Sequence, residues 1–218
     1  MKKLFTLILL IYASAASAQW SDVNNQFFDS LHMPVSIVTN VQKNPIIVQS
    51  YPDGGYFVIW EDDRNVAVTN TDIYAQKYDK TGKRLWADNG VPVSNGPYRE
   101  QYTLSSNQDY RNRSVAATDS AGGFYIAYYD DSVTNYSWYR MCVQHMKSNG
   151  NAVFGAAGFI AAQSVPNNGS TFSAPFLIAD GNKGFYLSYV QTYSNDYVEV
   201  YDYRDENGTM KLYGGGKV

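Results

Sequence analysis

The chain has 218 residues, and its 17 lysines and arginines against 20 aspartates and glutamates give a formal net charge of −3 at pH 7. This mild acidity offers no basic surface for nucleic acid or for anionic membranes. The length is sufficient for one sizeable core, and the single cysteine, Cys142, excludes an internal disulfide. Stability must therefore come from apolar and aromatic burial, and the 20 Tyr, 10 Phe and 4 Trp favour strands over helices.

The first 18 residues predict a secretory signal peptide. Lys2 and Lys3 precede a short apolar run, residues 4–12, and Ala16-Ser17-Ala18 offers small residues for a signal peptidase. The apolar run is shorter than the about 20 residues needed to span a bilayer; the alternative is a buried N-terminal helix. Cleavage after Ala18 leaves 218 − 18 = 200 residues that begin at Gln19. We expect the mature chain to be secreted or to lie on the cell surface, without a membrane span.

The rest of the chain contains an internal repeat, which is the first feature to establish in any fold assignment. Gly54-Gly55 recurs 68 residues later as Gly122-Gly123, and Trp86 recurs at the same offset as Phe154. A third copy aligns Gly184 with Gly123. The copies predict a lead-in segment, residues 19–40, and repeat units over about 41–107, 108–170 and 171–218.

Each unit predicts four antiparallel strands joined by glycine turns. The second strand of each unit carries large apolar residues at its first, third and fifth positions, which share one face of a strand. The expected second strands are residues 56–60, 124–128 and 185–189; the first strands are 45–50, 114–118 and 175–179; the third strands are 73–78, 141–146 and 198–204; the fourth strands begin near 85, 153 and 212. One four-stranded sheet per repeat favours an all-β, propeller-like array, and residues 35–38 are expected to supply an additional strand.

The segment Trp60-Glu61-Asp62-Asp63-Arg64, with Gly54-Gly55 before it and Ile73-Tyr74-Ala75-Gln76-Lys77-Tyr78-Asp79 after it, resembles the repeats of secreted, propeller-like proteins of Bacteroidetes-type bacteria. Many of those proteins carry a type IX sorting domain, which is absent here. The resemblance covers residues 41–218 and is complete only in the first copy, since the third has Val190-Gln191-Thr192 in place of the acids. It implies an array of about three units without an assigned activity.

The turn at residues 79–86 is similar to the turn motifs of other propellers, in which an aromatic side chain docks on the neighbouring blade. Trp86, Phe154 and Tyr213 are accordingly predicted to pack as wedges between sheets. Neither His32 nor His145 has partners at the spacing that Ser-His-Asp catalysis or a metal site requires. Cys142 falls in an apolar strand and is predicted to be a small core residue.

Two groups of residues are candidates for ligand binding. The acids Asp62, Asp63, Asp130 and Asp131 recur at an offset of 68 and could supply calcium ligands, or cap turns instead. The rings Tyr136, Trp138 and Tyr139 could stack on sugars or fill a partner's pocket, or pack between sheets. No cofactor other than calcium is predicted.

The leading hypothesis is a non-enzymatic secreted or surface module that binds glycan or protein. The alternatives are an extracellular propeller glycosidase or lyase, whose carboxylates would come from different blades, and a structural spacer of a longer secreted protein. Closed propellers use about 4–8 blades, so three units leave sheets uncovered. We therefore expect missing C-terminal blades or self-association.

Overall fold

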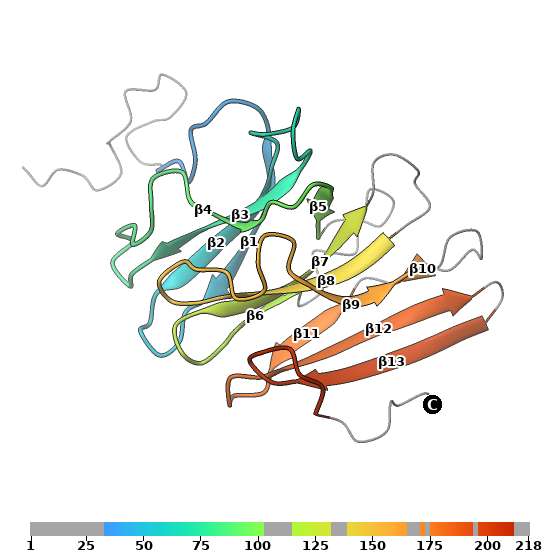
Figure 1. The fold of residues 1–218 in the computed structure, drawn as a ribbon. Helices are drawn as coiled ribbons and strands as arrows, with labels where there is room; N and C mark the ends of the chain where they lie inside the picture. Colours follow the sequence, from blue (N-terminus) through green and yellow to red (C-terminus); the bar gives the residue numbers. More distant parts are fainter. Residues whose placement is uncertain are drawn as a thin grey trace, which may run out of the picture. The chain divides into compact units, whose positions relative to one another are not determined.

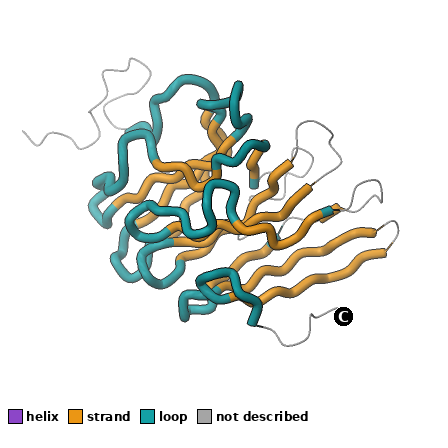
Figure 2. Tube along the Cα trace, viewed as in Figure 1, coloured by secondary structure: helices purple, strands orange, loops and turns teal. Residues whose placement is uncertain are grey.

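A computed structural model describes residues 33–102, 115–131, 139–164, 171–172, 175–193 and 196–211 (Figure 1). Strands and loops account for all of these residues (Figure 2). No helix that could cross a membrane occurs among them. The elements below all belong to one unit, Val35–Val218. The predicted signal peptide and the predicted wedge Tyr213 lie outside the described residues.

The first sheet contains β1 (Gln42–Gln49), β2 (Tyr56–Asp62), β3 (Asp72–Tyr78) and β4 (Val91–Ser94), in that order and antiparallel. The turn between β1 and β2 contains Gly54 at φ 75°, a conformation that favours glycine. The strands β2 and β3 are buried on both faces almost throughout, as expected for a strand between two layers.

The second sheet contains β5 (Arg99–Gln101), β6 (Ala116–Thr118), β7 (Phe124–Asp131), β8 (Tyr139–Met146) and β9 (Phe159–Gln163). Both β5 and β6 pair with β7, at its opposite ends, so the first strand of this unit is split in two. The second sheet thus begins before the boundary predicted near residue 107, because β5 already belongs to it.

The third sheet contains β10 (Thr171–Phe172), β11 (Phe176–Ala179), β12 (Phe185–Tyr193) and β13 (Asp196–Arg204). Its first strand is split in the same way, since β10 and β11 pair with opposite ends of β12. The strand β13 pairs with β12 along nine residue positions. The repeat is therefore visible in the strand pairing as well as in the sequence.

The three sheets pack face to face through their second strands. Phe57 and Ile59 of β2 form one buried cluster with Phe124 and Ile126 of β7. The opposite face of β7 packs against β12 in a second buried cluster. That cluster includes Tyr125 and Ala127 of β7 and Leu187 and Tyr189 of β12. The alternation predicted for the second strands is confirmed in β7, because one of its faces meets the first sheet and the other meets the third sheet.

Two wedge residues lie as predicted. The Trp86 ring packs 5.4 Å from the Phe57 ring and 6.5 Å from the Phe124 ring, and its Nε1 donates to the Ser148 carbonyl at 3.1 Å. Phe154 packs with the second buried cluster, against Gly208 of the next unit. Each aromatic side chain thus joins its own sheet to the second turn of the following one.

Two strand predictions are wrong. The segments that begin at residues 85 and 153 are not in strands; the residues just before them, Arg84 and Ala152, form only an isolated bridge each, and the fourth strands start later, at Val91 and Phe159. Gln76 holds the first of these segments as a loop, since its side chain donates to the Ala87 carbonyl and accepts from the Trp86 amide. Residues 35–38 form no strand. The described architecture is thus all-β, with three antiparallel sheets, none of which closes on itself.

Candidate functional site

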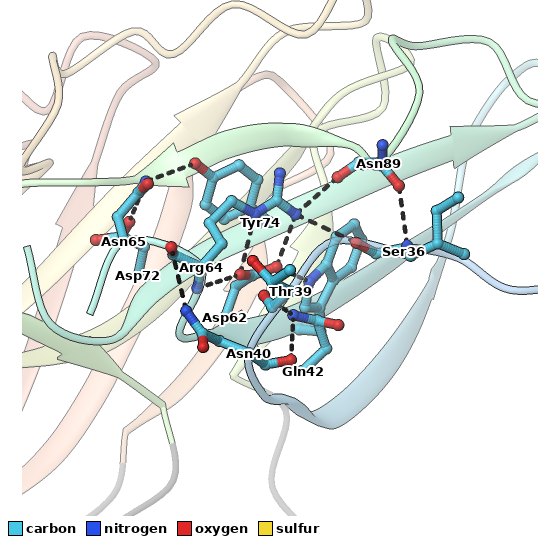
Figure 3. Close-up of polar contacts among 12 residues, drawn as sticks. Ser36, Thr39, Asn40, Gln42, Asp62, Arg64, Asn65, Asp72, Tyr74 and Asn89 are labelled. Carbon is cyan, nitrogen blue, oxygen red and sulfur yellow. Dashed lines mark hydrogen bonds and ion pairs between the residues drawn. The ribbon is translucent and has the colours of Figure 1, made fainter. Parts of the chain in front are cut away.

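Asp62 lies at the end of β2 in a network that Figure 3 shows. Trp60 Nε1 donates to one carboxylate oxygen at 2.6 Å, and the Arg64 guanidinium donates to both oxygens, at 2.7 and 3.0 Å. The same guanidinium lies 3.7 Å from the centre of the Tyr74 ring and donates to the Asn89 carbonyl at 2.9 Å. A fork-shaped, bidentate pair of this kind fixes geometry. Asp62 therefore locks the end of the strand to the loop before β4.

The neighbouring acids are also engaged by protein groups. Asp63 lies 3.1 Å from Lys43 Nζ and accepts from the Thr71 hydroxyl at 2.7 Å. Asp130 of β7 lies 2.5 Å from Arg140 Nη2, on the next strand. Basic side chains therefore pair with three of the four acids that the sequence pattern offered to calcium.

Three of the four candidate calcium ligands have described side chains. Asp62, Asp63 and Asp130 each face an arginine or a lysine, whereas the side chain of Asp131 lies outside the described residues. Within the described ranges, no group of three or more histidine, cysteine or acidic side chains could hold a metal ion. The geometry favours the turn-capping and ion-pairing role for the three carboxylates that can be seen.

Glu100 of β5 is a buried carboxyl that sequence reasoning missed. Its side chain is 0% exposed, it stands directly opposite Asp130 in the strand pairing, and its amide donates to the Thr71 carbonyl at 2.8 Å. Neither of its carboxyl oxygens has a hydrogen-bond partner among the described residues. Burial, with Asp130 and Asp72 close by, raises the pKa of Glu100 to about 9. The nearby backbone amides act to lower the pKa of Glu100, but they are not placed to form a hydrogen bond with its carboxyl. Glu100 is therefore protonated at neutral pH.

In all three sheets, the same kind of polar contact joins the first turn to the third strand. A polar side chain of the third strand meets the turn acid at 2.6 Å (Lys77 to Asp53), 2.8 Å (His145 to Asp119) and 3.0 Å (Tyr203 to Asp180). Burial acts to raise the pKa of Asp119, but His145 and two backbone amides outweigh it and hold that pKa below its usual value. His145 is thus a structural partner of the turn.

The same third-strand residues pair with a ring directly opposite on the second strand. Lys77 Nζ lies 5.3 Å from the Phe57 ring centre, His145 stacks at 4.2 Å on Tyr125, and Tyr203 stacks at 4.5 Å on Tyr186. In the first two sheets this pair contacts the turn of the next sheet. Lys77 Nζ donates to the Gly122 carbonyl at 2.7 Å, and the Tyr125 hydroxyl donates to the Lys183 carbonyl. In the third sheet no such turn meets the pair in the described part of the chain.

We call the face of the third sheet that carries this pair the outer face. By strand register it contains Phe176, Ile178, Tyr186, Ser188, Val190, Thr192, Tyr197, Glu199, Tyr201 and Tyr203. Phe176 is 52% exposed, Ile178 55%, Tyr201 50% and Tyr197 76%. The equivalent faces of the first two sheets are buried in the two clusters. The tyrosines at alternate positions of β13, Tyr197, Tyr201 and Tyr203, were a signal in the sequence that could have identified this face.

The remaining residues that the sequence analysis considered are four without a described side chain and the buried Cys142. Tyr136, Trp138 and His32 lie outside the described residues, as does the side chain of Tyr139. Cys142 is free and buried, as predicted for a core residue, and burial followed by the nearby Asp130 carboxylate raises the pKa of its thiol.

The fold and its repeated contacts define a β-sheet repeat protein. No protein-family model and no curated protein matches the chain. The chain is similar to a solved structure of a polysaccharide lyase, the PL25 ulvan lyase, with 12% sequence identity and a TM-score of 0.48 over 82% of this chain. The chain spans 46% of the length of that lyase.

Proposed function

We propose that the chain is a non-enzymatic, exported β-repeat module with propeller-like sheet packing, and that it binds a protein partner through the outer face of the third sheet. One observation carries this proposal. The outer face repeats a surface that is buried beneath a further sheet in both earlier units, yet here four large apolar side chains are at least half exposed. Exposed apolar surface of this extent marks an interaction site.

The composition of the outer face favours a protein over a glycan. Its rings are interspersed with aliphatic side chains such as Ile178 and Val190, and Glu199 is the one charged member of the face. A sugar surface requires several polar groups to orient its hydroxyls. Glu199 is the one carboxylate that this face offers beside the hydroxyls of its tyrosines, Ser188 and Thr192. A flat apolar face instead suits another sheet, as the packing between the first and second sheets illustrates.

The alternative of a glycosidase or lyase finds less support among the described carboxyls. Glycoside hydrolysis needs one protonated and one ionised carboxyl on either side of a bound sugar. Glu100 has the raised pKa of a general acid, but both it and Asp130 are buried, at 0% and 1% exposure. In the folded chain both carboxyls are therefore closed off from a bound polysaccharide.

Photo-crosslinking tests the proposed binding surface. A benzoylphenylalanine at position 201 should crosslink to protein in the native host, whereas the same residue in place of Val68 should not, because Val68 is also exposed, at 80%, but belongs to the first unit. Equal crosslinking at the two positions would refute the proposal. Retention on a polysaccharide gel that is lost in a Tyr201→Ala variant would refute it in favour of a glycan.

Export is tested by the N-terminus of the mature protein. Expressed in a bacterium with its own leader, the chain should accumulate outside the cytoplasm and begin at Gln19. Exported material that still begins at Met1 would contradict the predicted cleavage after Ala18.

A further inference from the structure

We infer that the partner of the outer face is a second copy of this chain, with the two outer faces packed against each other across a two-fold axis. This inference rests on the proposed function, since it names the partner of the same surface. Closed two-fold pairs are the commonest assemblies of identical chains, and they need a surface that is complementary to itself.

The first argument is continuity with the packing already present. Within the chain, sheet meets sheet twice through faces of alternating aromatic and aliphatic residues. The stacked rings of Tyr186 and Tyr203 on the outer face correspond by register to the Tyr125–His145 pair, which the third sheet covers. The outer face is thus a surface of the kind that this chain already packs against a sheet.

The second argument concerns the opposite end of the stack. The far face of the first sheet carries Trp60 and Tyr74, which are only 3% and 7% exposed. Arg64 lies over the Tyr74 ring, and Gly90 of the loop before β4 lies against the Trp60 ring. The part of that face over β2 and β3 is therefore covered, although Ile47 of β1 shares the face and is 72% exposed. The outer face of the third sheet is the larger apolar surface, and pairing it with its own copy gives a closed dimer.

The third argument is charge. Glu199 is the one charged side chain on the strands of the outer face, where it lies beside Val190, and the Asp180 carboxylate of the adjoining turn accepts from the Tyr203 hydroxyl at 3.0 Å. A face that is nearly free of charge can meet its own copy without the repulsion that like charges in contact would cause.

The size of the face sets the expected strength. The strands β12 and β13 have nine residues each. At ~3.4 Å per residue and ~4.8 Å between three strands, the face measures roughly 450 Å². Standard interfaces bury about 800 Å² per partner, so we expect a weak dimer with a dissociation constant on the order of 10–100 µM.

Sedimentation velocity of the purified chain over about 1–500 µM tests the inference. The wild-type chain should shift from monomer to dimer, and Tyr201→Glu should raise the dissociation constant by about tenfold or more, because it buries a charge in each half of the interface. Ile47→Glu is the matched control, since Ile47 is 72% exposed on the first sheet and should leave the equilibrium unchanged. Tyr197→Glu provides a second variant, and circular dichroism checks that each variant is folded.

A monomer at every concentration, or equal loss of dimer in the Tyr201 and Ile47 variants, would overturn the second copy as partner. The crosslinking experiment separates this failure from failure of the proposed function. A position-201 crosslink to a different protein would keep the binding surface and reject the dimer, whereas no crosslink at all would reject both.

Discussion

Glu100→Gln is expected to leave the stability of the protein unchanged at pH 5 and to increase it at pH 8. Glu100 is enclosed between β7 and the start of β3, with the Asp130 and Asp72 carboxyls near it and Arg140 bound to Asp130. Its pKa is about 9 in the folded chain, against an ordinary value of 4.5. The folded state therefore disfavours the charged form, which glutamine cannot adopt.

The sign of the pH dependence follows from proton binding. Between pH 4.5 and about pH 9, the unfolded chain has lost the Glu100 proton while the folded chain retains it. The contribution of Glu100 to the free energy of unfolding should therefore be fully present below pH 4.5 and fall by up to about 1.4 kcal/mol per pH unit through this window. The fall in this contribution between pH 5 and pH 8 is on the order of 4 kcal/mol. The pKa of Asp72 is also raised by burial, which acts in the same direction.

Urea denaturation at pH 5 and pH 8, followed by tryptophan fluorescence, measures this difference. Glu206→Gln is the control, since the Glu206 side chain is 47% exposed on a turn of the third unit. Its pH dependence should match that of the wild-type chain. An identical fall in stability for Glu100→Gln and wild type would show that Glu100 ionises freely in the folded state.

Trp86→Ala is expected to destabilise the chain by about 3 kcal/mol, the lower end of the range for truncating an aromatic side chain in a core. The ring is partly buried and packs between Phe57 and Phe124 of two different sheets. Alanine would leave a gap there and remove the hydrogen bond to the Ser148 carbonyl. Gly150 of the second sheet lies against the indole, so its backbone would also lose a packing partner.

Lys83→Ala is the matched control, because Lys83 lies in the same turn with an exposed side chain. Its backbone contacts to Asp79 persist in alanine, so stability should change by no more than about 0.5 kcal/mol. Equal denaturation midpoints for the two variants would mean that the wedge contributes little to the packing of the sheets.

Local chemistry alone was sufficient to predict much of this fold. The second strands, with their alternating aromatic and aliphatic residues, and the glycine turns before them were predictable because side-chain period and backbone freedom are properties of neighbouring residues. The equivalence of Trp86 and Phe154 followed from the same repeat. A strand whose two faces are both apolar predicts a packed layer on either side, and β7 has a sheet on each side.

Tertiary structure decided the features that depend on distant segments. Asp62 pairs with Arg64 two residues away, whereas Asp130 pairs with Arg140 on the next strand, so the same recurring acid has a different partner in each copy. The burial of Glu100 depends on β5 pairing with β7 beside the start of β3, which its short polar sequence does not indicate. The exposure of the outer face likewise reflects what packs on the third sheet, not its own pattern. Periodicity determines which side chains share a face, but only the approach of other segments determines whether that face is covered.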